Sequence, residues 1–270
     1  MSEPRRASVV VRAKDEAASI GRTLELLASQ TAELQTIVVD SGSRDETVAI
    51  ARDAGAEVVE IPAESFTYGH ALNVGCERAR EAAIIALSAH AFPLDDGWAA
   101  RMVAALDDER VACAVGYGNA PEGGPLRERR VQDIELARRY PRWGYSNGQG
   151  VFRAELWRAR PFREDMPGVE DKEWAWHWME RGYVSIVDPG LSVDHQHHHE
   201  GVRERFDRQR REWLGLGMFV DIPEELAPGL LREWWTELDG RRSRVRARLS
   251  PRRAAELAGK YAGCRAARRR

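Results

Sequence analysis

Apolar positions in the first third of the chain alternate between short β-branched runs and longer segments with helical spacing. The runs predict four strands and the segments between them predict three helices. The strands fall at residues 8–12, 36–39, 57–61 and 83–87, and the helices at residues 18–27, 48–53 and 71–80. Such an alternation is typical of parallel strands joined by helices on both faces of a sheet. We therefore expect an α/β fold with a Rossmann-like sheet, mixed but mainly parallel and flanked by helices.

The pattern is less regular after residue 90. An apolar run predicts a strand at 111–115, and the charged residues at 127–139 predict a helix. A helix is also expected from Asp171 to about residue 181, because Gly182 follows and glycine readily adopts the left-handed conformation that ends a helix. From about residue 201 the sequence is helical and rich in arginine. We therefore expect a ligand-binding domain at residues 1–200 and a helical, basic extension at residues 201–270.

The composition is 43% hydrophobic and 31% charged, which is typical of a soluble protein with a sizeable core. The sequence has neither an apolar run long enough to span a membrane nor the apolar core of a secretion signal at its N-terminus, so we expect a cytoplasmic protein. Its three cysteines are widely scattered and predict neither a disulfide framework nor a cysteine metal site.

The formal net charge of -2 conceals a strongly basic C-terminus. Residues 241–270 contain twelve lysines and arginines and one acid, Glu256. This segment is either a solvated tail or a surface that contacts an anionic membrane, which would place the protein peripherally at the inner membrane face. Nucleic acid is a poorer partner, because no pattern of base-stacking aromatic residues accompanies the arginines.

Polar residues follow the predicted strands of the first half. Ligands of open α/β sheets bind beyond the carboxyl ends of the strands, so these residues are candidates for ligand binding. In chain order the candidates are Arg12, Lys14, Glu16, Asp40, Ser41, Ser43, Asn73, Ser88, Ala89 and His90. An acid at the tip of the second strand, such as Asp40, can accept hydrogen bonds from a base or a ribose.

Glu170 and Asp171 stand at the start of a predicted helix. The positive end of the helix dipole favours ionised carboxylates there, which suits a general base at the rim of a site. Acidic residues at this position are also common as simple helix caps. The two acids are therefore candidates for catalysis, with capping as the alternative.

Four histidines are gathered between residues 195 and 199. His195, His197 and His199 fall at alternate positions, so a strand that began near residue 191 and continued this far would place all three on one face. Neutral imidazole is a common ligand of divalent metals, and such a group near a carboxylate indicates a metal or phosphate site. A solvated, histidine-rich loop explains the same residues.

Residues 140–150, with the sequence YPRWGYSNGQG, combine aromatic, amide and glycine residues. This composition suits a platform for a sugar or another polar acceptor. Trp143, Ser146 and Asn147 are the candidates for acceptor binding, and Trp143 is equally well explained as a packing residue beside a turn.

Several of these segments together resemble the family 2 glycosyltransferases with the GT-A fold, particularly rhamnosyltransferase-like bacterial members. They are VVVRAKDEAASIGRTLELLASQ, IVVDSGSRDETVAIA, GHALNVG, LSAHAFPLDDGW, EDKEW and VDHQH, within residues 8–200. The resemblance implies that Arg12, Glu16 and Asp40 line a nucleotide pocket and that Asp171 is the catalytic base of an inverting transfer. It also implies a nucleotide-diphosphate sugar as donor, and as acceptor a hydroxyl of an unidentified glycan, lipid-linked molecule or small molecule.

One segment departs from the family pattern. Members commonly carry an aspartate after the fourth strand, in a DxD-like element that holds a divalent cation against the diphosphate, whereas this chain has Ser88-Ala89-His90. A histidine ligand favours Mn²⁺ over Mg²⁺. The family's VxH element ends at His195, which would bring His195 and His197 toward the same cation. His90 could instead donate directly to the diphosphate without a metal, but we favour a metal.

We therefore expect an inverting, nucleotide-sugar-dependent hexosyltransferase or related glycosyltransferase. One alternative is a non-catalytic relative that binds a nucleotide sugar or a partner protein and has lost the metal aspartate. Another is a metal hydrolase built around the histidines, which leaves the IVVDSGSRDET block without a purpose.

Overall fold

The computed structural model describes residues 4–195, 201–222 and 251–269. Contacts divide the chain into two compact units. The first unit comprises Met1–Asp165 and Glu170–Gln196, and the second comprises Met166–Val169 and His197–Arg270. The candidate ligand His197 and residues 241–250 of the basic C-terminal segment lie outside the described residues.

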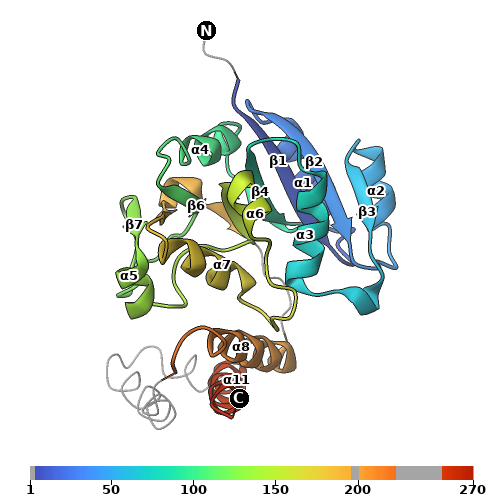
Figure 1. The fold of residues 1–270 in the computed structure, drawn as a ribbon. Helices are drawn as coiled ribbons and strands as arrows, with labels where there is room; N and C mark the ends of the chain where they lie inside the picture. Colours follow the sequence, from blue (N-terminus) through green and yellow to red (C-terminus); the bar gives the residue numbers. More distant parts are fainter. Residues whose placement is uncertain (1–3, 196–200, 223–250, 270) are drawn as a thin grey trace. The chain divides into compact units, whose positions relative to one another are not determined.

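A mixed sheet of eight strands forms the centre of the first unit (Figure 1), in the order β3-β2-β1-β4-β8-β6-β9-β7. The strands are β1 (Arg6–Ala13), β2 (Glu33–Asp40), β3 (Glu57–Glu60), β4 (Ala83–Ser88), β6 (Val111–Val115), β7 (Arg130–Gln132), β8 (Gln149–Arg153) and β9 (Val184–Val187). β1 pairs parallel with β2 and β4, and β2 pairs parallel with β3. β8 runs antiparallel between β4 and β6. The expected mixed, mainly parallel sheet is confirmed.

Each face of the sheet packs against helices and forms one apolar cluster with them. α1 (Ile20–Ala28), α2 (Thr47–Asp53) and α4 (Trp98–Ala104) contribute to one cluster, and α3 (Tyr68–Arg78), α5 (Ile134–Arg139), α6 (Ala154–Ala159) and α7 (Glu170–Met179) contribute to the other. Side chains alternate along β1, since Val9 and Val11 enter the first cluster and Val10 the second. The β-branched run therefore buries both faces of its strand, as a central parallel strand requires.

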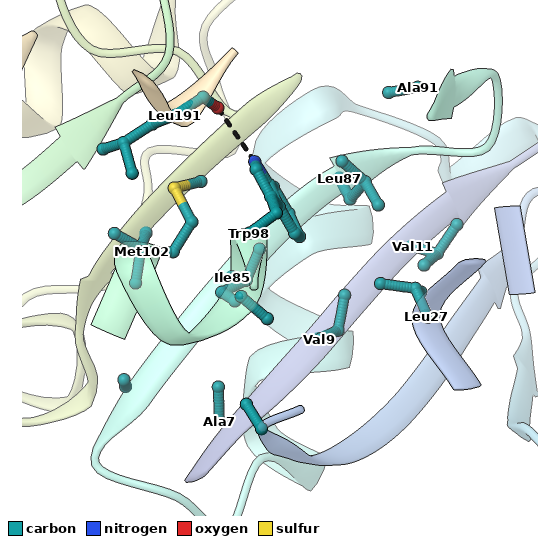
Figure 2. Packing of buried hydrophobic residues seen from close by; sticks show 14 of the residues in the cluster. Ala7, Val9, Val11, Leu27, Ile85, Leu87, Ala91, Trp98, Met102 and Leu191 are labelled. Carbon is teal, nitrogen blue, oxygen red and sulfur yellow. Dashed lines mark hydrogen bonds between the residues drawn. The ribbon is translucent and has the colours of Figure 1, made fainter. Parts of the chain in front are cut away.

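Trp98 anchors α4 in the first cluster, as Figure 2 shows. Its side chain is fully buried, and its indole Nε1 donates to the carbonyl oxygen of Leu191 at 2.8 Å. Leu191 ends the short helical turn η2 (Pro189–Leu191), just before β10 (Val193–His195), which pairs antiparallel with β5 (Ala91–Pro93). The tryptophan thus helps to fix the two-stranded ribbon that carries His195. A second short turn, η1 (Ala63–Ser65), precedes α3.

The expected helix at residues 127–139 is wrong in its first half. The chain forms β7 there, which pairs antiparallel with β9, and only α5 is helical. The side chain of Asp133 caps α5 by accepting a hydrogen bond from the backbone N–H of Leu136 at 2.9 Å. An N-cap residue lies outside the helical conformation, so the helix cannot extend backwards through residue 132.

In the second unit, α8 (Val202–Leu216) and α11 (Pro251–Ala267) pack closely together. Gly259 and Gly263 make this approach possible, because a Cβ atom at Gly263 would lie only 2.6 Å from the backbone oxygen of Arg210 in α8. Trp213, Leu216 and Cys264 form a small core between the helices. No helix in the described ranges is long and apolar enough to span a membrane.

The segment Met166–Val169 belongs to this second unit and is held in an unusual conformation. Val169 packs against the small core of α8 and α11, and its φ is 61°. A β-branched residue rarely adopts a positive φ, and such a conformation costs about 1–3 kcal/mol. Gly215 of α8 lies against the segment, since a Cβ there would be 2.7 Å from Cγ2 of Val169 and closer still to the carbonyl oxygen of Gly168.

Candidate functional site

The loops that follow β1 and β2 are joined by hydrogen bonds at the carboxyl edge of the sheet. The backbone N–H of Asp15 donates to Oγ of Ser43 at 2.8 Å, and the N–H of Arg44 donates to Oδ1 of Asp15 at 2.8 Å. The buried carboxylate of Asp40 accepts from the N–H groups of Gly42 and Ser43, both at 2.9 Å, and from the Ser43 hydroxyl. Asp40 therefore orders the loop after β2, and the two strand ends form one polar surface.

Glu16 links this surface to the end of β4. Its Oε1 atom lies 2.7 Å from Nδ1 of His90, and its Oε2 atom accepts a hydrogen bond from Ser19 at 2.6 Å. Burial by itself raises the pKa of Glu16, but the hydrogen bonds from His90 and Ser19 outweigh it and leave the pKa below its ordinary value. A carboxylate in contact with one ring nitrogen fixes the orientation of an imidazole, as it does for many metal-binding histidines.

His195 lies beside His90, with ring centroids 5.0 Å apart. The pairing of β10 with β5 explains this neighbourhood, because His195 is opposite Ala91, the residue that follows His90. Gly148 borders the same place, since a Cβ there would be 3.2 Å from Cε1 of His195 and 3.6 Å from Oγ of Ser88. The structure thus gathers the end of β4, the start of β8 and the two imidazoles.

His90 and His195 could supply only some of the ligands that a cation needs. Within the described residues, no group of three or more histidine, cysteine, aspartate or glutamate side chains could hold a metal ion. The described chain offers two neighbouring imidazoles, of which one is oriented by Glu16. Such a set suits a transition-metal ion that takes its other ligands from a bound oxyanion better than it suits Mg²⁺, which prefers oxygen ligands throughout.

Asp171 lies in the first turn of α7, and backbone N–H groups hold its carboxylate. Oδ2 accepts from the N–H of Asn147 at 3.1 Å, and Oδ1 accepts from the N–H of Lys172 at 2.7 Å. The ammonium of Lys172 donates to the carbonyl oxygens of Gly144 at 3.0 Å and Tyr145 at 2.5 Å. The loop before β8 is therefore fastened to the start of α7, and the half-buried carboxylate of Asp171 has a fixed position.

Glu170 is buried beside Asp171, and its surroundings oppose its ionisation. Burial and the neighbouring Asp171 raise the pKa of Glu170 to about 7, although the guanidinium of Arg12 acts in the opposite direction. Nη1 of Arg12 lies 3.7 Å from Oε1 of Glu170, and the side-chain amide of Asn147 donates to the same oxygen at 3.4 Å. Burial thus works against the ionised state that the helix start would favour.

Arg12 makes its contacts close to the two acids, Glu170 and Asp171. Its guanidinium donates to the backbone oxygens of Tyr68 and Asn147, both at 3.4 Å, and lies over the ring of Tyr68. In the register of β1 and β4, Arg12 is opposite Ser88. Arg12 therefore stands between the end of β4 and the start of α7, where it can stabilise negative charge on either side.

The sequence matches the family model for glycosyl transferase family 2 over residues 8–184. The chain belongs to glycosyl transferase family 2. Its sheet and flanking helices are those of the GT-A fold, so the expected fold and family are confirmed. No curated protein sequence gave a match to the chain.

Solved glycosyltransferase structures have the same fold at low sequence identity. The mannosyltransferase PcManGT from Pyrobaculum calidifontis, in complex with GDP-Man and Mn²⁺, is 20% identical with a TM-score of 0.64, over 99% of this chain and 74% of that one. S. aureus TarS 1-349 in complex with UDP-GlcNAc is 15% identical with a TM-score of 0.54, over 98% and 92% of the two chains. Glucosyl-3-phosphoglycerate synthase from Mycobacterium tuberculosis is 21% identical with a TM-score of 0.58, over 82% and 81%.

Two of the candidate residues, Asn73 and Trp143, have side chains that are buried and hydrogen-bonded within the fold. The amide of Asn73 is buried and accepts from Trp157 Nε1 at 3.0 Å and the N–H of Phe162 at 3.1 Å, while its NH₂ donates to the Phe162 oxygen at 2.9 Å. Trp143 is buried in the second cluster, and its indole donates to the oxygen of Asn119 at 2.8 Å. Both side chains stabilise the fold of the family 2 domain.

The other candidates lie along the carboxyl edge of the sheet. Lys14 is exposed and Ser41 is buried, with the N–H of Ser41 donating to the oxygen of Ala13 at 3.0 Å. Ala89 is buried, and its oxygen accepts from the hydroxyl of Thr23 at 2.7 Å. Ser146 is half-buried and its hydroxyl accepts from the N–H of Gly148 at 3.3 Å.

Two site residues of the family 2 chain are not singled out by the sequence pattern. Lys172 fastens the loop before β8, and the buried hydroxyl of Tyr145 donates to Oδ1 of Asn147 at 2.9 Å. A lysine in an exposed-looking helix and a tyrosine in a glycine-rich loop have many ordinary explanations. The only available signal is that Lys172 follows the ED pair directly.

Proposed function

We propose that this family 2 member is an inverting glycosyltransferase, close to the rhamnosyltransferase-like bacterial branch, that moves a hexose or related sugar from a nucleotide-diphosphate donor to an acceptor hydroxyl. The carboxylate of Asp171 is the observation that carries the proposal. Two backbone N–H groups hold it at the start of α7, and Arg12 connects the adjacent Glu170 to the end of β4. A general base needs such a fixed position near the reacting hydroxyl.

Asp171 would accept the proton of the acceptor hydroxyl while that oxygen attacks the anomeric carbon from the face opposite the leaving group. The new glycosidic bond forms as the bond between the sugar and the diphosphate breaks, and the nucleoside diphosphate leaves with the bonding electrons. Glu170, Arg12 and Asn147 would position this base rather than exchange protons with the acceptor. Their mutual contacts at 3.1–3.7 Å support that role.

The donor would occupy the polar surface at the carboxyl ends of β1, β2 and β4. Lys14, Ser41 and Ser43 join Asp40 and Glu16 along this edge, and the GDP-Man and UDP-GlcNAc bound by the similar proteins support a nucleotide-sugar donor. The acceptor would bind at the loop before β8, where Ser146 and Asn147 would contact it. Trp143 of the same loop is buried in the second cluster and would stabilise the loop.

A divalent cation would be held by His90 and His195, with His197 as a further candidate outside the described residues. When bound, it would offset the negative charge that develops on the leaving diphosphate. The two imidazoles and the Mn²⁺ in the PcManGT complex support manganese as the first ion to test. Glu16 would orient His90 and so act on the ion indirectly.

A thermal-shift screen of nucleotide-diphosphate sugars, each with Mn²⁺, Mg²⁺ or chelator, tests the donor and the cation together. One donor should raise the melting temperature, and the increase should be larger with Mn²⁺ than with Mg²⁺. Transfer or slow donor hydrolysis should follow, and at saturating donor Asp171→Asn should be slower than the wild-type protein by about 10²-fold or more. Absence of stabilisation by every nucleotide sugar would contradict the proposal.

A non-catalytic relative is the second candidate, and the histidine in place of the family's aspartate is the observation that favours it. Such a relative would bind a nucleotide sugar or a partner without turning the donor over. Stabilisation by a nucleotide sugar, combined with the absence of both transfer and hydrolysis across a broad acceptor panel, would select this candidate.

A further inference from the structure

The second unit carries a surplus of positive charge. Its described residues in the ranges 201–222 and 251–269 include eleven arginines and lysines and five acids, and Lys260 is the only lysine among them. Arginine is the better residue for phosphate, because its planar guanidinium donates two parallel hydrogen bonds to the oxygens of one anion. The composition therefore points to phosphate groups more than to a general need for solubility.

Three of these arginines surround one shallow groove of about 550 Å³. The residues that line the groove are Arg210 from α8 and Tyr261, Ala262, Arg265, Ala266 and Arg269 from α11. The positions on α11 recur at intervals of three and four residues and therefore share one side of the helix. The two alanines leave space between the longer side chains, and the ring of Tyr261 is 43% exposed.

No acid of the described ranges neutralises the charges in this groove. Elsewhere in the unit, Arg205 and Arg253 both pair with Glu256, at 2.8 Å and 3.2 Å. Within the described ranges, Arg210, Arg265 and Arg269 are exposed and form no ion pair, and no acid lines the groove. Three guanidinium groups without an acidic partner in the described part of the chain and an exposed tyrosine therefore line the same groove.

We propose that this groove docks the chain on an anionic phospholipid surface by binding lipid phosphate between Arg210, Arg265 and Arg269. The exposed tyrosine supports a membrane as the partner, because a phenol ring is stable at the boundary between headgroups and acyl chains. Single-stranded nucleic acid would be expected to meet several stacking rings, and the groove has one. Each basic group near an anionic surface changes partitioning by roughly fivefold, so three should change it by about 100-fold.

Vesicle flotation with the full-length protein measures lipid binding and needs no sugar transfer. A negative flotation result would therefore contradict the lipid-binding groove without contradicting the proposed enzyme activity. Wild-type protein should bind vesicles that contain about one third phosphatidylglycerol and ignore pure phosphatidylcholine, and binding should weaken as salt rises. The triple variant Arg210→Gln, Arg265→Gln, Arg269→Gln should lose about 100-fold in partitioning. Tyr261→Ser should weaken binding further at high salt, where the apolar part dominates.

A matched control removes the same charge elsewhere. Arg52→Gln, Arg80→Gln, Arg110→Gln changes three exposed arginines of the first unit and should leave binding nearly unchanged. Equal losses of vesicle binding in the two triple variants would show that only net charge matters and would overturn the proposal that this groove binds lipid. The proposal also fails if wild-type protein does not float with anionic vesicles at low salt. Displacement by millimolar inorganic phosphate, or by an oligonucleotide at far lower concentration than lipid, would identify a free phosphate or nucleic-acid site instead.

Discussion

Gly215→Ala tests whether the second unit controls the position of the two acids at the start of α7. Gly215 lies in α8 against the segment Met166–Val169, and the acids Glu170 and Asp171 follow this segment directly along the chain. A methyl group at Gly215 would come 2.7 Å from Cγ2 of Val169 and closer still to the carbonyl oxygen of Gly168. Backbone atoms cannot rotate away as a flexible side chain can, so either the segment or α8 must move.

The required movement is large on the scale of catalysis. Ordinary contacts begin at 3.4 Å, so the segment and α8 must separate by about 1 Å, and we expect the segment to take up most of this shift. Overpacking of this kind costs about 1–3 kcal/mol of stability. A displacement of about 1 Å in a catalytic group can lower turnover by about 10²-fold. Val169 already has a positive φ of 61°, so its backbone has little freedom to change conformation. A displacement of the segment should therefore also displace Asp171.

The assay combines thermal unfolding with turnover at saturating donor and acceptor, at a temperature where the variant is folded. Gly259→Ala is the matched control, because a Cβ there would lie 3.0 Å from Cβ of Gln209 and closer still to the carbonyl oxygen of Phe206. It crowds α8 against α11 to a similar degree and does not touch the segment before Glu170. Both variants should lose stability, and only Gly215→Ala should lose turnover.

Two results would refute this reasoning. One is a destabilised Gly215→Ala protein with wild-type kcat, which would show that the segment yields without moving the acids. The other is an equal fall of kcat in Gly259→Ala, which would show that turnover follows the stability of the helical pair in general. Donor binding measured by calorimetry should be similar in the wild-type protein and both variants, because the proposed donor residues lie at the carboxyl ends of β1, β2 and β4.

The remaining predictions concern single side chains. Asp171→Asn should lower turnover by about 10²-fold or more while donor affinity by calorimetry is unchanged; near-normal turnover would remove Asp171 from the mechanism. Stability to urea should decrease as pH rises from about 4.5 to about 7, because folded Glu170, with its pKa raised to about 7, keeps a proton that the unfolded carboxyl releases. Glu170→Gln should flatten this decrease, and parallel curves for the two proteins would exclude it. Asn73→Ala should shift the urea midpoint by the equivalent of about 2–4 kcal/mol, because buried donors lose their acceptor; a shift below about 0.5 kcal/mol would contradict the structural role. His90→Asp should change the cation preference of donor binding from Mn²⁺ toward Mg²⁺, and an unchanged preference would argue against His90 as a ligand.

The N-terminal half of the fold could be predicted because its signals are local. The β-branched run of β1 and the amphipathic spacing of α1 each fix an element without help from distant residues. β8 could not be predicted in this way, since Gln149–Arg153 contains a glycine and few β-branched residues. It is a strand because β4 and β6 stand on either side of it. Its position is thus decided by tertiary pairing, which a single sequence does not display.

The candidate site was predictable where residues follow strand ends, and less so where contacts depend on loops. The position of Glu16 and His90 at the ends of β1 and β4 follows from sheet order, and they lie 2.7 Å apart. Asn73 also stands in a promising place along the chain, yet its amide faces Trp157 and Phe162. The direction of a side chain on a helix depends on which face is buried, and the weakly amphipathic α3 does not reveal that face. The role of Lys172 depends on the path of the loop before β8, which no local pattern encodes.

The antiparallel insertion of β8 has a consequence for the order in which the protein can be completed during synthesis. β4 (Ala83–Ser88) is apolar and buried in the finished sheet, and one of its edges pairs only with β8 (Gln149–Arg153). The ribosome makes about 60 residues between the two, which takes roughly 3–12 s at 5–20 residues per second. During that interval the edge of β4 is an unpaired template for other chains. Slower translation of residues 89–148 should therefore increase aggregation of nascent chains, although the finished protein would be identical.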